Sequence, residues 1–570
     1  MTDFSEACAA SVRLAWDGEA PVRWVPLKLD PPRTETALGR DFLLVPGSAL
    51  ETMARQAFLD LSFRIRPTYA RELAGMAYDP ANDAKDRFAA LSLLENSIES
   101  ARGIFPLCQD TGTAAVYAWK GENVLVDSLL SDSRLLAAGA ALAWRQGGLR
   151  NSQLVASGSF MERNTGDNSP LACEVFSEKG SEYHLLFIAK GGGSANKTLL
   201  FQETRRLLQP LAFETFARQA ISQIGVSACP PYRIVFVIGG QSPEQTALAA
   251  KLATTGALDA LPSEPGPEGG PYRDKELEAT IVRLASESGW GAQFGGRRMA
   301  RDARVIWLPR HAASLPVVLA VSCAAHRQLY GRIGPDGCFL EHLADGDELA
   351  RIRAETQARF GIPTPELSTI ANPTAAVLPG RTVAADSGIH FRRVDLDTLN
   401  PADLSSGEFV QLWGSVVLAR DAAHARLSAM IQEGKPLPEW TTRPVFYAGP
   451  TETPEGEVIG SIGPTTSKRM DSYQEELMSR GAFTISLGKG ERTAACRDAC
   501  ARHGGVYLVT TGGAAATAAR RYVSSMSVLD WPELGMEAVR LVTLAGLPAM
   551  VAVDSQGTDY YAGLRDNQRV

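Results

Sequence analysis

Cysteine is scarce in this chain: its 570 residues include eight cysteines, and no two of them are separated by only two residues. Cysteines this sparse do not form the disulfide framework of a small secreted protein. The missing Cys-x-x-Cys spacing also gives no direct signal for a zinc ribbon or a ferredoxin-type cluster. We therefore expect reduced thiols.

Other absences narrow the class of protein. No apolar run reaches the length that spans a membrane, and there is no internal repeat or low-complexity tract. The formal net charge of -7, with both signs mixed along the chain, argues against a general nucleic-acid or anionic-membrane surface. The first ten residues, MTDFSEACAA, carry two acids and no apolar segment, so we expect no secretory signal and a cytoplasmic protein.

The apolar content predicts a multidomain globular protein. Hydrophobic residues make up 45% of a chain that is too long for one core, which favours two or three domains. Helical stretches and short β-rich runs alternate up to about residue 255 and indicate a mixed α+β domain. They are helices at 54–65 and 86–102 and strands at 183–190 and 232–240; a further helix at 274–288 and a strand at 315–323 follow.

A second domain follows a segment rich in proline, glycine, serine and threonine. We place a linker at residues 361–390, between an N-terminal domain of residues 1–360 and a C-terminal α/β domain of residues 391–570. The C-terminal part alternates apolar β-type runs with glycine-containing turns. Residues 261–271, LPSEPGPEGGP, are predicted to form a surface loop without chemistry.

Residues 191–198, GGGSANKT, come within one residue of a phosphate-binding loop. That loop needs glycine at its sixth position, where a side chain obstructs the approach of the phosphate, and Asn196 stands there. No later strand end offers an evident magnesium-binding Asp. Two interpretations stay open: a turn whose amides bind another anion, at a helix N-terminus if residues 194–208 are helical, or a tight turn that simply needs glycine.

Two cysteines lie four residues apart near the C-terminus. Cys496 and Cys500 share one face of the helix predicted for residues 491–505, and His503 follows them. A closed metal site needs a fourth ligand, and nothing nearby supplies one. We therefore favour small apolar positions on an alanine-rich helix.

Polar residues recur at predicted strand ends and glycine turns, where α/β folds place ligands. In PLCQDTGT (106–113), Cys108 and Asp110 could present a thiolate and a carboxyl group to one small space. In GPTTSKRMDSY (463–473), Thr465 and Thr466 precede Arg469 by about one helical turn, if a helix begins there.

A series of motifs resembles the class I, iron-sulfur-dependent fumarate hydratases. The motifs are PLCQDTGT, NTGDN, KGGGSANK, ACPPYRIVFVIGG, LPRHAASLPVVLAVSC, RDAAHARL, YAGPTETPEG, GPTTSKRMDSY, TTGGAAA and PELGMEA. They occur in the family's order over nearly the whole chain, and several are eight or more residues long. The resemblance implies an α+β and α/β fold of two domains, the smaller C-terminal one of the swivelling β/β/α type, and a homodimer.

The resemblance also implies a cofactor. In that family three cysteines hold a 4Fe-4S cluster, and the matching positions are Cys108, Cys229 and Cys323. Three thiolates leave one iron without a protein ligand, the arrangement of a catalytic Lewis acid rather than of an electron-transfer centre. The implied reaction is the reversible hydration of fumarate to (S)-malate, a step of the tricarboxylic acid cycle.

Substrate and proton-transfer roles are implied position by position. The family's substrate-binding residues match Gln109, Arg150, Gly193, Arg420, Arg469 and Lys489. Arginine suits the two carboxylates because its planar fork donates two parallel hydrogen bonds. Asp110 is the expected acid, Thr465 the expected base with Lys489 stabilising its alkoxide, and His311 is expected to hydrogen-bond Asp110 or the substrate.

Alternatives remain at two levels. Related iron-sulfur hydro-lyases act on tartrate or mesaconate, and one methyl group changes selectivity by only about 1 to 3 kcal/mol. Two domains in one chain favour fumarate hydratase over two-subunit tartrate dehydratases. A phosphate-loop nucleotide-binding module is the alternative from another class.

Overall fold

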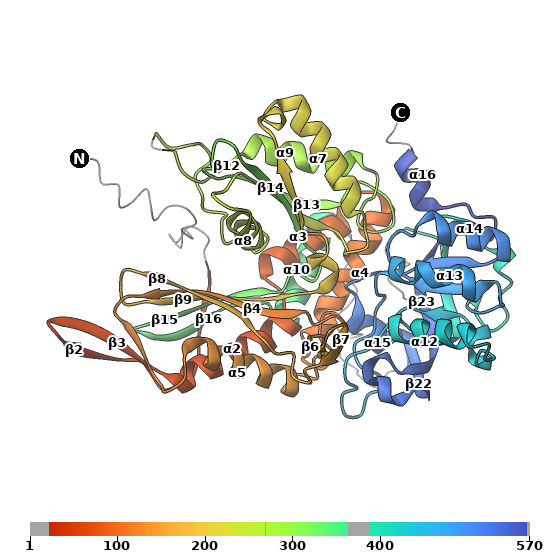
Figure 1. The fold of residues 1–570 in the computed structure, drawn as a ribbon, viewed down its shortest axis with the longest axis horizontal. Coiled ribbons are helices and arrows are strands. Elements are labelled where there is room, and N and C mark those ends of the chain that lie inside the picture. Colours follow the sequence, from red (N-terminus) through yellow and green to blue (C-terminus); the bar gives the residue numbers. More distant parts are fainter. Residues whose placement is uncertain (1–21, 268, 363–387, 567–570) are drawn as a thin grey trace.

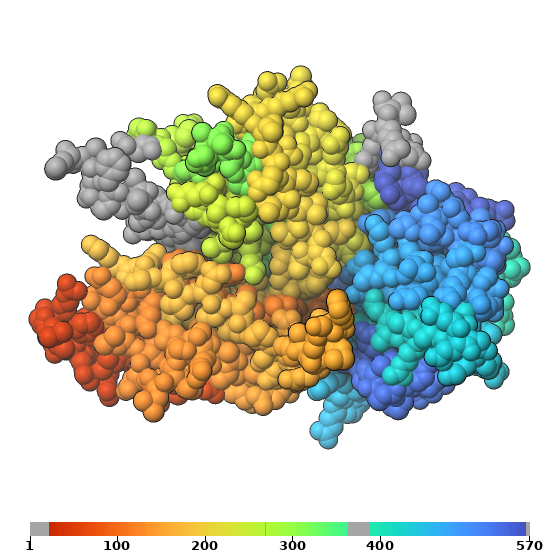
Figure 2. Space-filling model, in the orientation of Figure 1, coloured from red at the N-terminus to blue at the C-terminus, as the bar shows by residue number. Residues whose placement is uncertain are grey.

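The structure, a computed structural model, describes residues 22–267, 269–362 and 388–566. The predicted linker at 361–390 lies almost entirely outside these residues. We call residues 22–362 the N-terminal half and residues 388–566 the C-terminal half; the two lie side by side and in contact (Figures 1 and 2). The fold is mixed α/β with several sheets, and no described helix is long and apolar enough to cross a membrane.

A six-stranded sheet forms one layer of the N-terminal half. Its strands, in spatial order, are β1 (Trp24–Pro26), β16 (Gly337–Glu341), β15 (Gln328–Gly334), β9 (Tyr183–Lys190), β4 (Thr113–Gly121) and β8 (Ala172–Glu178). Helices α2 (Gly47–Phe63) and α5 (Asp132–Gln146) cover one face. Val116 and Phe187 pack toward these helices, whereas Tyr117 and Leu186 join a cluster on the other face. Both faces are therefore covered, which explains the nearly continuous apolar run of β9.

A five-stranded sheet forms the second layer. Its strands, in spatial order, are β10 (Leu199–Glu203), β14 (Leu315–Ser322), β11 (Tyr232–Ile238), β13 (Ala300–Trp307) and β12 (Tyr272–Arg273). Helix α8 (Pro243–Ala253) packs between the two sheets, and α7 (Pro210–Ile224) and α9 (Lys275–Glu287) cover the other face. Helices α3 (Pro67–Tyr78), α4 (Ala84–Ser100) and α10 (Gly346–Arg359) fill the centre (Figure 1). Smaller sheets contain β2 (Arg33–Ala37), β3 (Arg40–Pro46) and β5 (Val124–Asp127), and β6 (Leu154–Gly158) and β7 (Met161–Asn164).

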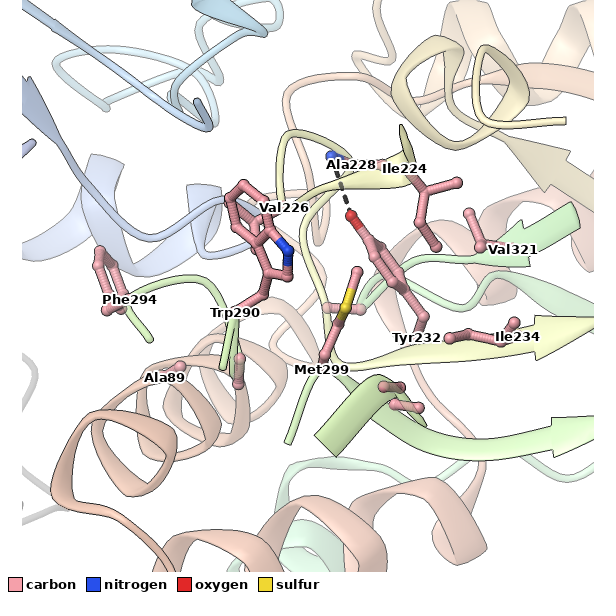
Figure 3. Packing of buried hydrophobic residues seen from close by; sticks show 14 of the residues in the cluster. Ala89, Ile224, Val226, Ala228, Tyr232, Ile234, Trp290, Phe294, Met299 and Val321 are labelled. Atoms are coloured by element: carbon pink, nitrogen blue, oxygen red, sulfur yellow. Dashed lines mark hydrogen bonds between the residues drawn. The ribbon is translucent and has the colours of Figure 1, made fainter. Parts of the chain in front are cut away.

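The buried Tyr232 fixes the loop that leads into β11 (Figure 3). Its hydroxyl group accepts a hydrogen bond from the Ala228 N–H at 3.2 Å and donates one to the Gly225 carbonyl at 3.1 Å. Cys229 follows with a φ of +63°, a conformation that residues other than glycine rarely adopt. Because strained backbone persists only where its surroundings hold it, this tyrosine is part of what positions Cys229.

The C-terminal half is built on a sheet that closes on itself. Its strands, in spatial order, are β17 (Arg392–Asp395), β18 (Phe409–Leu418), β19 (Val445–Phe446), β20 (Ile485–Gly488), β21 (Val506–Val509), β23 (Val539–Val553) and β22 (Val523–Asp530). An additional pairing of β18 with β23 closes it around an apolar core. Its helices are α12 (Asp421–Gln432), α13 (Asp471–Met478), α14 (Ala494–His503), α15 (Ala515–Tyr522) and α16 (Tyr560–Asp566).

Helix α4 connects the two halves. The Asn96 side chain donates to the Leu107 carbonyl at 2.9 Å and to the Gly513 carbonyl at 3.1 Å, and accepts from the Thr517 N–H. Glu99 forms a 3.1 Å ion pair with Arg520 of α15. These buried polar contacts fix how the halves dock, because breaking one leaves an unpaired buried group.

Most predicted elements are confirmed, since α2, α4, α9, α14, β9, β11 and β14 lie where the periodicity placed them. Two helices that the sequence left open do not form as considered. Residues 194–208 form the end of a four-residue helix, α6 (Gly192–Ala195), then strand β10 and a 3-10 turn, η1 (Arg205–Leu207). Helical structure in the 463–473 segment begins only at η5 (Ser467–Met470), so Thr465 and Thr466 precede it.

Candidate functional site

The candidate site lies where the two halves meet, at one edge of the five-stranded sheet. Strands β11 and β14 are antiparallel, and their register pairs Arg233 with Ser322. Cys229, just before β11, and Cys323, just after β14, therefore flank the same edge of the sheet. The Ala324 N–H donates to the Cys229 carbonyl at 2.9 Å, which ties the two segments together.

Three thiol groups share this edge. Burial raises the pKa of the Cys108 thiol, and it raises that of Cys229 to about 11. The thiolates of Cys323 and Cys108 add to the shift at Cys229, so the three side chains are close enough to feel one another's charge. Among the described residues, no three His, Cys, Asp or Glu side chains converge as on a single metal ion. A cluster does not require that convergence, because each cysteine binds a different iron.

Lys489 brings a cation from the C-terminal half to these thiols. Its ammonium group donates to Cys229 Sγ at 2.8 Å. Burial, the largest effect, acts to lower the lysine pKa, but the charges of Cys229, Cys108 and Cys323 raise it above its ordinary value. The ammonium is thus held at the point where negative charge gathers.

Gly512 and Gln293 lie beside the contact between Lys489 and Cys229. A β-carbon at Gly512 would lie 2.2 Å from Cys229 Sγ and 3.0 Å from Lys489 Cδ, so only glycine leaves both groups in place. The Gln293 amide donates to the Pro230 and Gly512 carbonyls at 3.0 Å and accepts from the Gly512 N–H at 2.7 Å.

Asp110 lies in a strongly cationic setting. Its carboxylate accepts a hydrogen bond from the Gly192 N–H at 2.8 Å and lies 3.5 Å from Arg150. Burial, the largest single effect, raises the Asp110 pKa, but the charges of Arg150, Arg327 and Lys489 together hold it below its ordinary value. Asp110 is therefore ionised, and it must take up a proton before it can donate one.

Gln109 and Arg150 reach across to the C-terminal half. The Gln109 amide donates to the Pro464 carbonyl at 3.0 Å, and Arg150 Nη1 donates to the Gly449 carbonyl at 3.5 Å. Both side chains are buried. Gln109 and Arg150, both predicted to bind substrate, thus lie next to Asp110.

Arg420 forms a cationic group with Arg150 and Arg469, two other arginines predicted to bind substrate. Its Nη2 donates to Glu537 at 2.9 Å, whereas its buried Nε has no hydrogen-bond partner in the described part of the chain. Burial lowers its pKa to about 10, and the charges of Arg150 and Arg469 act in the same direction. Arg469 is half exposed and pairs with Asp421 at 3.1 Å. Three guanidinium groups in one space, with one of them incompletely paired, favour an anionic ligand.

The two adjacent threonines point in different directions. Thr465 is buried, and its hydroxyl donates to the Tyr447 carbonyl at 3.1 Å. The backbone of Thr466 forms an isolated β-bridge with Lys489, and the Thr466 hydroxyl group donates a hydrogen bond to the Ser227 carbonyl at 3.4 Å. Their separation follows from extended backbone rather than from the helix expected in the sequence.

The GGGSANKT turn is not a phosphate-binding loop in this structure. Such a loop leads into a full helix, whereas α6 has only four residues and is followed by a strand. The Gly192 amide already serves the carboxylate of Asp110. A β-carbon at Gly193 would lie 3.9 Å from Lys489 Nζ, so Gly193 faces the same space as the lysine.

His311 is not brought into the site within one chain. It is exposed on the loop between β13 and β14, whereas Cys323 follows the other end of β14. The strand separates the two by about 23 Å at 3.3 Å per residue. The family resemblance assigned His311 to the site, although the strand predicted at 315–323 already separates it from Cys323.

Several residues of the site had no role assigned to them from the sequence. Glu537 holds Arg420, Gln293 holds Gly512, and Arg327 acts electrostatically on both Cys108 and Asp110. Glu537 lies within the quoted motif PELGMEA, which gave it no role. Lys190, in KGGGSANK, is buried beside Cys323, and burial lowers its pKa to about 8.

The Cys496 and Cys500 pair lies apart from these residues on α14. Both side chains are fully buried and join the large apolar cluster that includes Tyr507 and Met550. His503 pairs with Glu475 at 3.1 Å. Packing accounts for both cysteines.

Comparisons with known proteins agree along most of the chain. Residues 51–332 match the family described as fumarate hydratase (Fumerase), and residues 366–564 match the one described as fumarase C-terminus. The chain is 40% identical to the aerobic class I fumarate hydratase of Salmonella typhimurium, over 93% of this chain and 87% of the relative. It is 41% identical to fumarate hydratase 2 of Leishmania major (92% and 88%) and 39% identical to the aerobic class I fumarate hydratase of Escherichia coli K12 (93% and 92%).

Replacing Gly512 tests how tightly the cysteine site is built. In Gly512→Ala the new methyl group displaces Cys229 Sγ, so we expect iron affinity after anaerobic reconstitution to fall by about 10- to 100-fold, as when supporting residues of metal sites are lost. Iron per chain is measured against chelator concentration. Gly75→Ala, where a β-carbon meets nothing within 4 Å, is the control. Equal iron retention in both variants would contradict the geometry.

Proposed function

The chain belongs to the class I fumarate hydratase family, and from that premise we propose how its residues carry out the hydration of fumarate. It is a hydro-lyase that interconverts fumarate and malate. The observation that carries the proposal is the meeting of three thiols, those of Cys108 and Cys229 buried and that of Cys323 partly buried, with Lys489 and a group of arginines at the junction of the two halves.

We propose that Cys108, Cys229 and Cys323 hold a 4Fe-4S cluster. Their position at one sheet edge, with Cys108 and Cys229 buried and Cys323 partly buried, and the cations around them suit an anionic cluster ligated by thiolates. When bound, the cluster supplies a Lewis-acidic iron, free of protein ligand, to the hydroxyl oxygen of malate. The remaining chemistry belongs to the chain's own residues.

The dicarboxylate is bound by groups from both halves. Arg420 and Arg469 would bind one carboxylate, because their guanidinium groups lie together and Arg420 Nε has no partner among the described residues. Gln109, Arg150, Gly193 and Lys489 would bind the rest of the molecule, because Gln109 and Arg150 reach the C-terminal half and Gly193 faces Lys489. Pairing with these cations offsets the desolvation of a dianion.

Proton transfer uses one residue from each half. Asp110, ionised beside its cations, accepts a proton from water during hydration and returns it to the leaving hydroxyl in the reverse direction. Thr465 exchanges the proton at C3, and Lys489, on the strand segment bridged to Thr466, stabilises the negative charge that Thr465 acquires.

The function is tested by assaying anaerobically reconstituted protein with fumarate, malate, mesaconate and tartrate. We expect turnover of fumarate and malate, and loss of most bound iron when Cys108, Cys229 or Cys323 is changed to serine, since a hydroxyl is a harder ligand than a thiolate. Cys496→Ser is the control and keeps its iron. Faster turnover of mesaconate or tartrate would reassign the substrate; full iron in Cys229→Ser would reject the ligand set.

Thr465 and Thr466 make a matched pair for the base. In Thr465→Val the shape is kept but the hydroxyl is lost, so we expect kcat to fall by about 100-fold or more while the cluster spectrum persists. Thr466→Val loses only a 3.4 Å hydrogen bond to the Ser227 carbonyl and keeps most activity. A dead Thr466 variant beside an active Thr465 variant would assign the base to Thr466.

A role for His311 requires a second chain. Arg310 Nη1 donates to the carbonyls of His311, Ala312 and Ser314, each at 3.0 Å, and the Ala313 N–H donates to His311 Nδ1. The loop is thus stiffened with the histidine exposed. We propose a homodimer in which this loop reaches the site of the partner.

Mixing two inactive chains tests that arrangement. If His311 acts across the dimer, randomly paired His311→Ala and Thr465→Val chains contain one intact site in each mixed dimer, giving about a quarter of wild-type activity. Each variant alone is the control. No recovered activity in a mixture that contains mixed dimers would place His311 outside the partner's site.

We also propose that the enzyme works in the cytoplasm, in the tricarboxylic acid cycle. All seven cysteines in the described residues are free, which suits a reducing compartment.

A further inference from the structure

Arg327 is a buried cation of the site whose guanidinium group forms no ion pair with any described residue. It follows Cys323 by four residues, just before β15, and is 4% exposed. Its Nε and Nη1 have no hydrogen-bond partner within the described residues. A buried guanidinium group with unused donors is costly, so this arrangement indicates that an acceptor arrives from outside the chain.

The surroundings of Arg327 contain the Asp110 carboxylate and the Cys108 thiol, but neither forms a hydrogen bond with its guanidinium group in the described structure. A β-carbon placed on Gly191 would lie 3.4 Å from Arg327 Nη2 and 3.0 Å from Asp110 Oδ2, so the guanidinium and the carboxylate flank the same small space. The carboxylate instead uses the Gly192 N–H and Arg150. Arg327 is also the strongest cationic influence on the Cys108 thiol.

The substrate carboxylates do not account for these donors. The cations that act most strongly on Arg420 are Arg150 and Arg469. Arg327 lies instead on the Cys108 side of the site. Its open donors therefore face the region of the thiols.

We propose that Arg327 is a positioning residue for the iron-sulfur cluster, whose sulfur atoms or Cys108 ligand accept the unpaired guanidinium N–H groups. This inference rests on the proposed function, because it assigns a partner within the same site. The guanidinium group stabilises the more negative, reduced state of the cluster, and it restrains the side of the cluster held by Cys108.

The role predicts a change that loss of packing alone does not produce. Arg327→Met keeps the volume but removes the charge and the donors, so the cluster's reduction potential should fall. A tenfold change in the one-electron equilibrium constant corresponds to 59 mV, and we expect a fall of at least that size. Arg327→Lys keeps the charge without the planar fork and should lie between Arg327→Met and wild type.

The experiment measures reduction potential, iron and sulfide content in anaerobically reconstituted full-length chains. Arg332→Met is the matched control: it lies on β15, is largely buried and pairs with Glu182 at 2.8 Å. We expect a wild-type potential in the control and the graded fall at Arg327. If Arg327→Met does not fold, Arg327→Gln takes its place, because it keeps hydrogen-bond donors but removes the charge. The same fall in reduction potential is expected for it.

Two results are kept apart by this design. Wild-type protein that holds no iron would refute the proposed function itself. A loaded wild type together with Arg327 variants of unchanged potential and iron content would overturn only the role of Arg327.

Discussion

The contact between the Lys489 ammonium and Cys229 Sγ, 2.8 Å long, joins the two halves of the chain at the candidate site. A buried ammonium is stable only beside negative charge, and here that charge comes from the thiols of the other half. The halves must therefore dock in one register. Hydrogen bonds from Asn96 to Gly513 and from Gln293 to Gly512 fix that register on either side of the contact.

Glycine leaves room for polar side chains of the site at two further places, one between the halves and one within the C-terminal half. A β-carbon at Gly463 would lie 2.6 Å from Gln109 Oε1, and one at Gly449 would lie 2.7 Å from Arg420 Cζ. A side chain at either position would push a predicted substrate-binding group out of the junction. The Gly-containing turns of the C-terminal half thus act as close-packing surfaces for polar side chains of the site, beyond their use in reversing the chain.

Local periodicity predicted the elements, but not the distances between them. The apolar runs of β9, β11 and β14 and the amphipathic α9 were recognisable because burial imposes a period on one segment at a time. The sequence allows a helix at residues 194–208, but Leu199–Glu203 form a strand whose side chains alternate between partly buried and exposed. This strand is too short for its alternation to outweigh the helix-forming residues on either side. The family motifs named most candidate site residues, yet the placement of His311 far from Cys323 and the unpaired donors of Arg327 depend on tertiary structure.

Arginine alone does not mark a functional site, and the number of buried guanidinium atoms without a hydrogen-bond partner sets Arg327 apart among the described arginines. Arg233 is nearly as buried as Arg327, but it is bound by Asp302 at 2.6 Å and by Asp259 at 3.1 Å, and no atom of it is left without a partner in the described structure. Arg420, by contrast, keeps one donor and Arg327 keeps two donors without a hydrogen-bond partner among the described residues. Because leaving buried donors unpaired costs free energy of folding, their persistence favours ligands that complete them. An anionic cluster on one side and a dicarboxylate on the other would supply the missing acceptors.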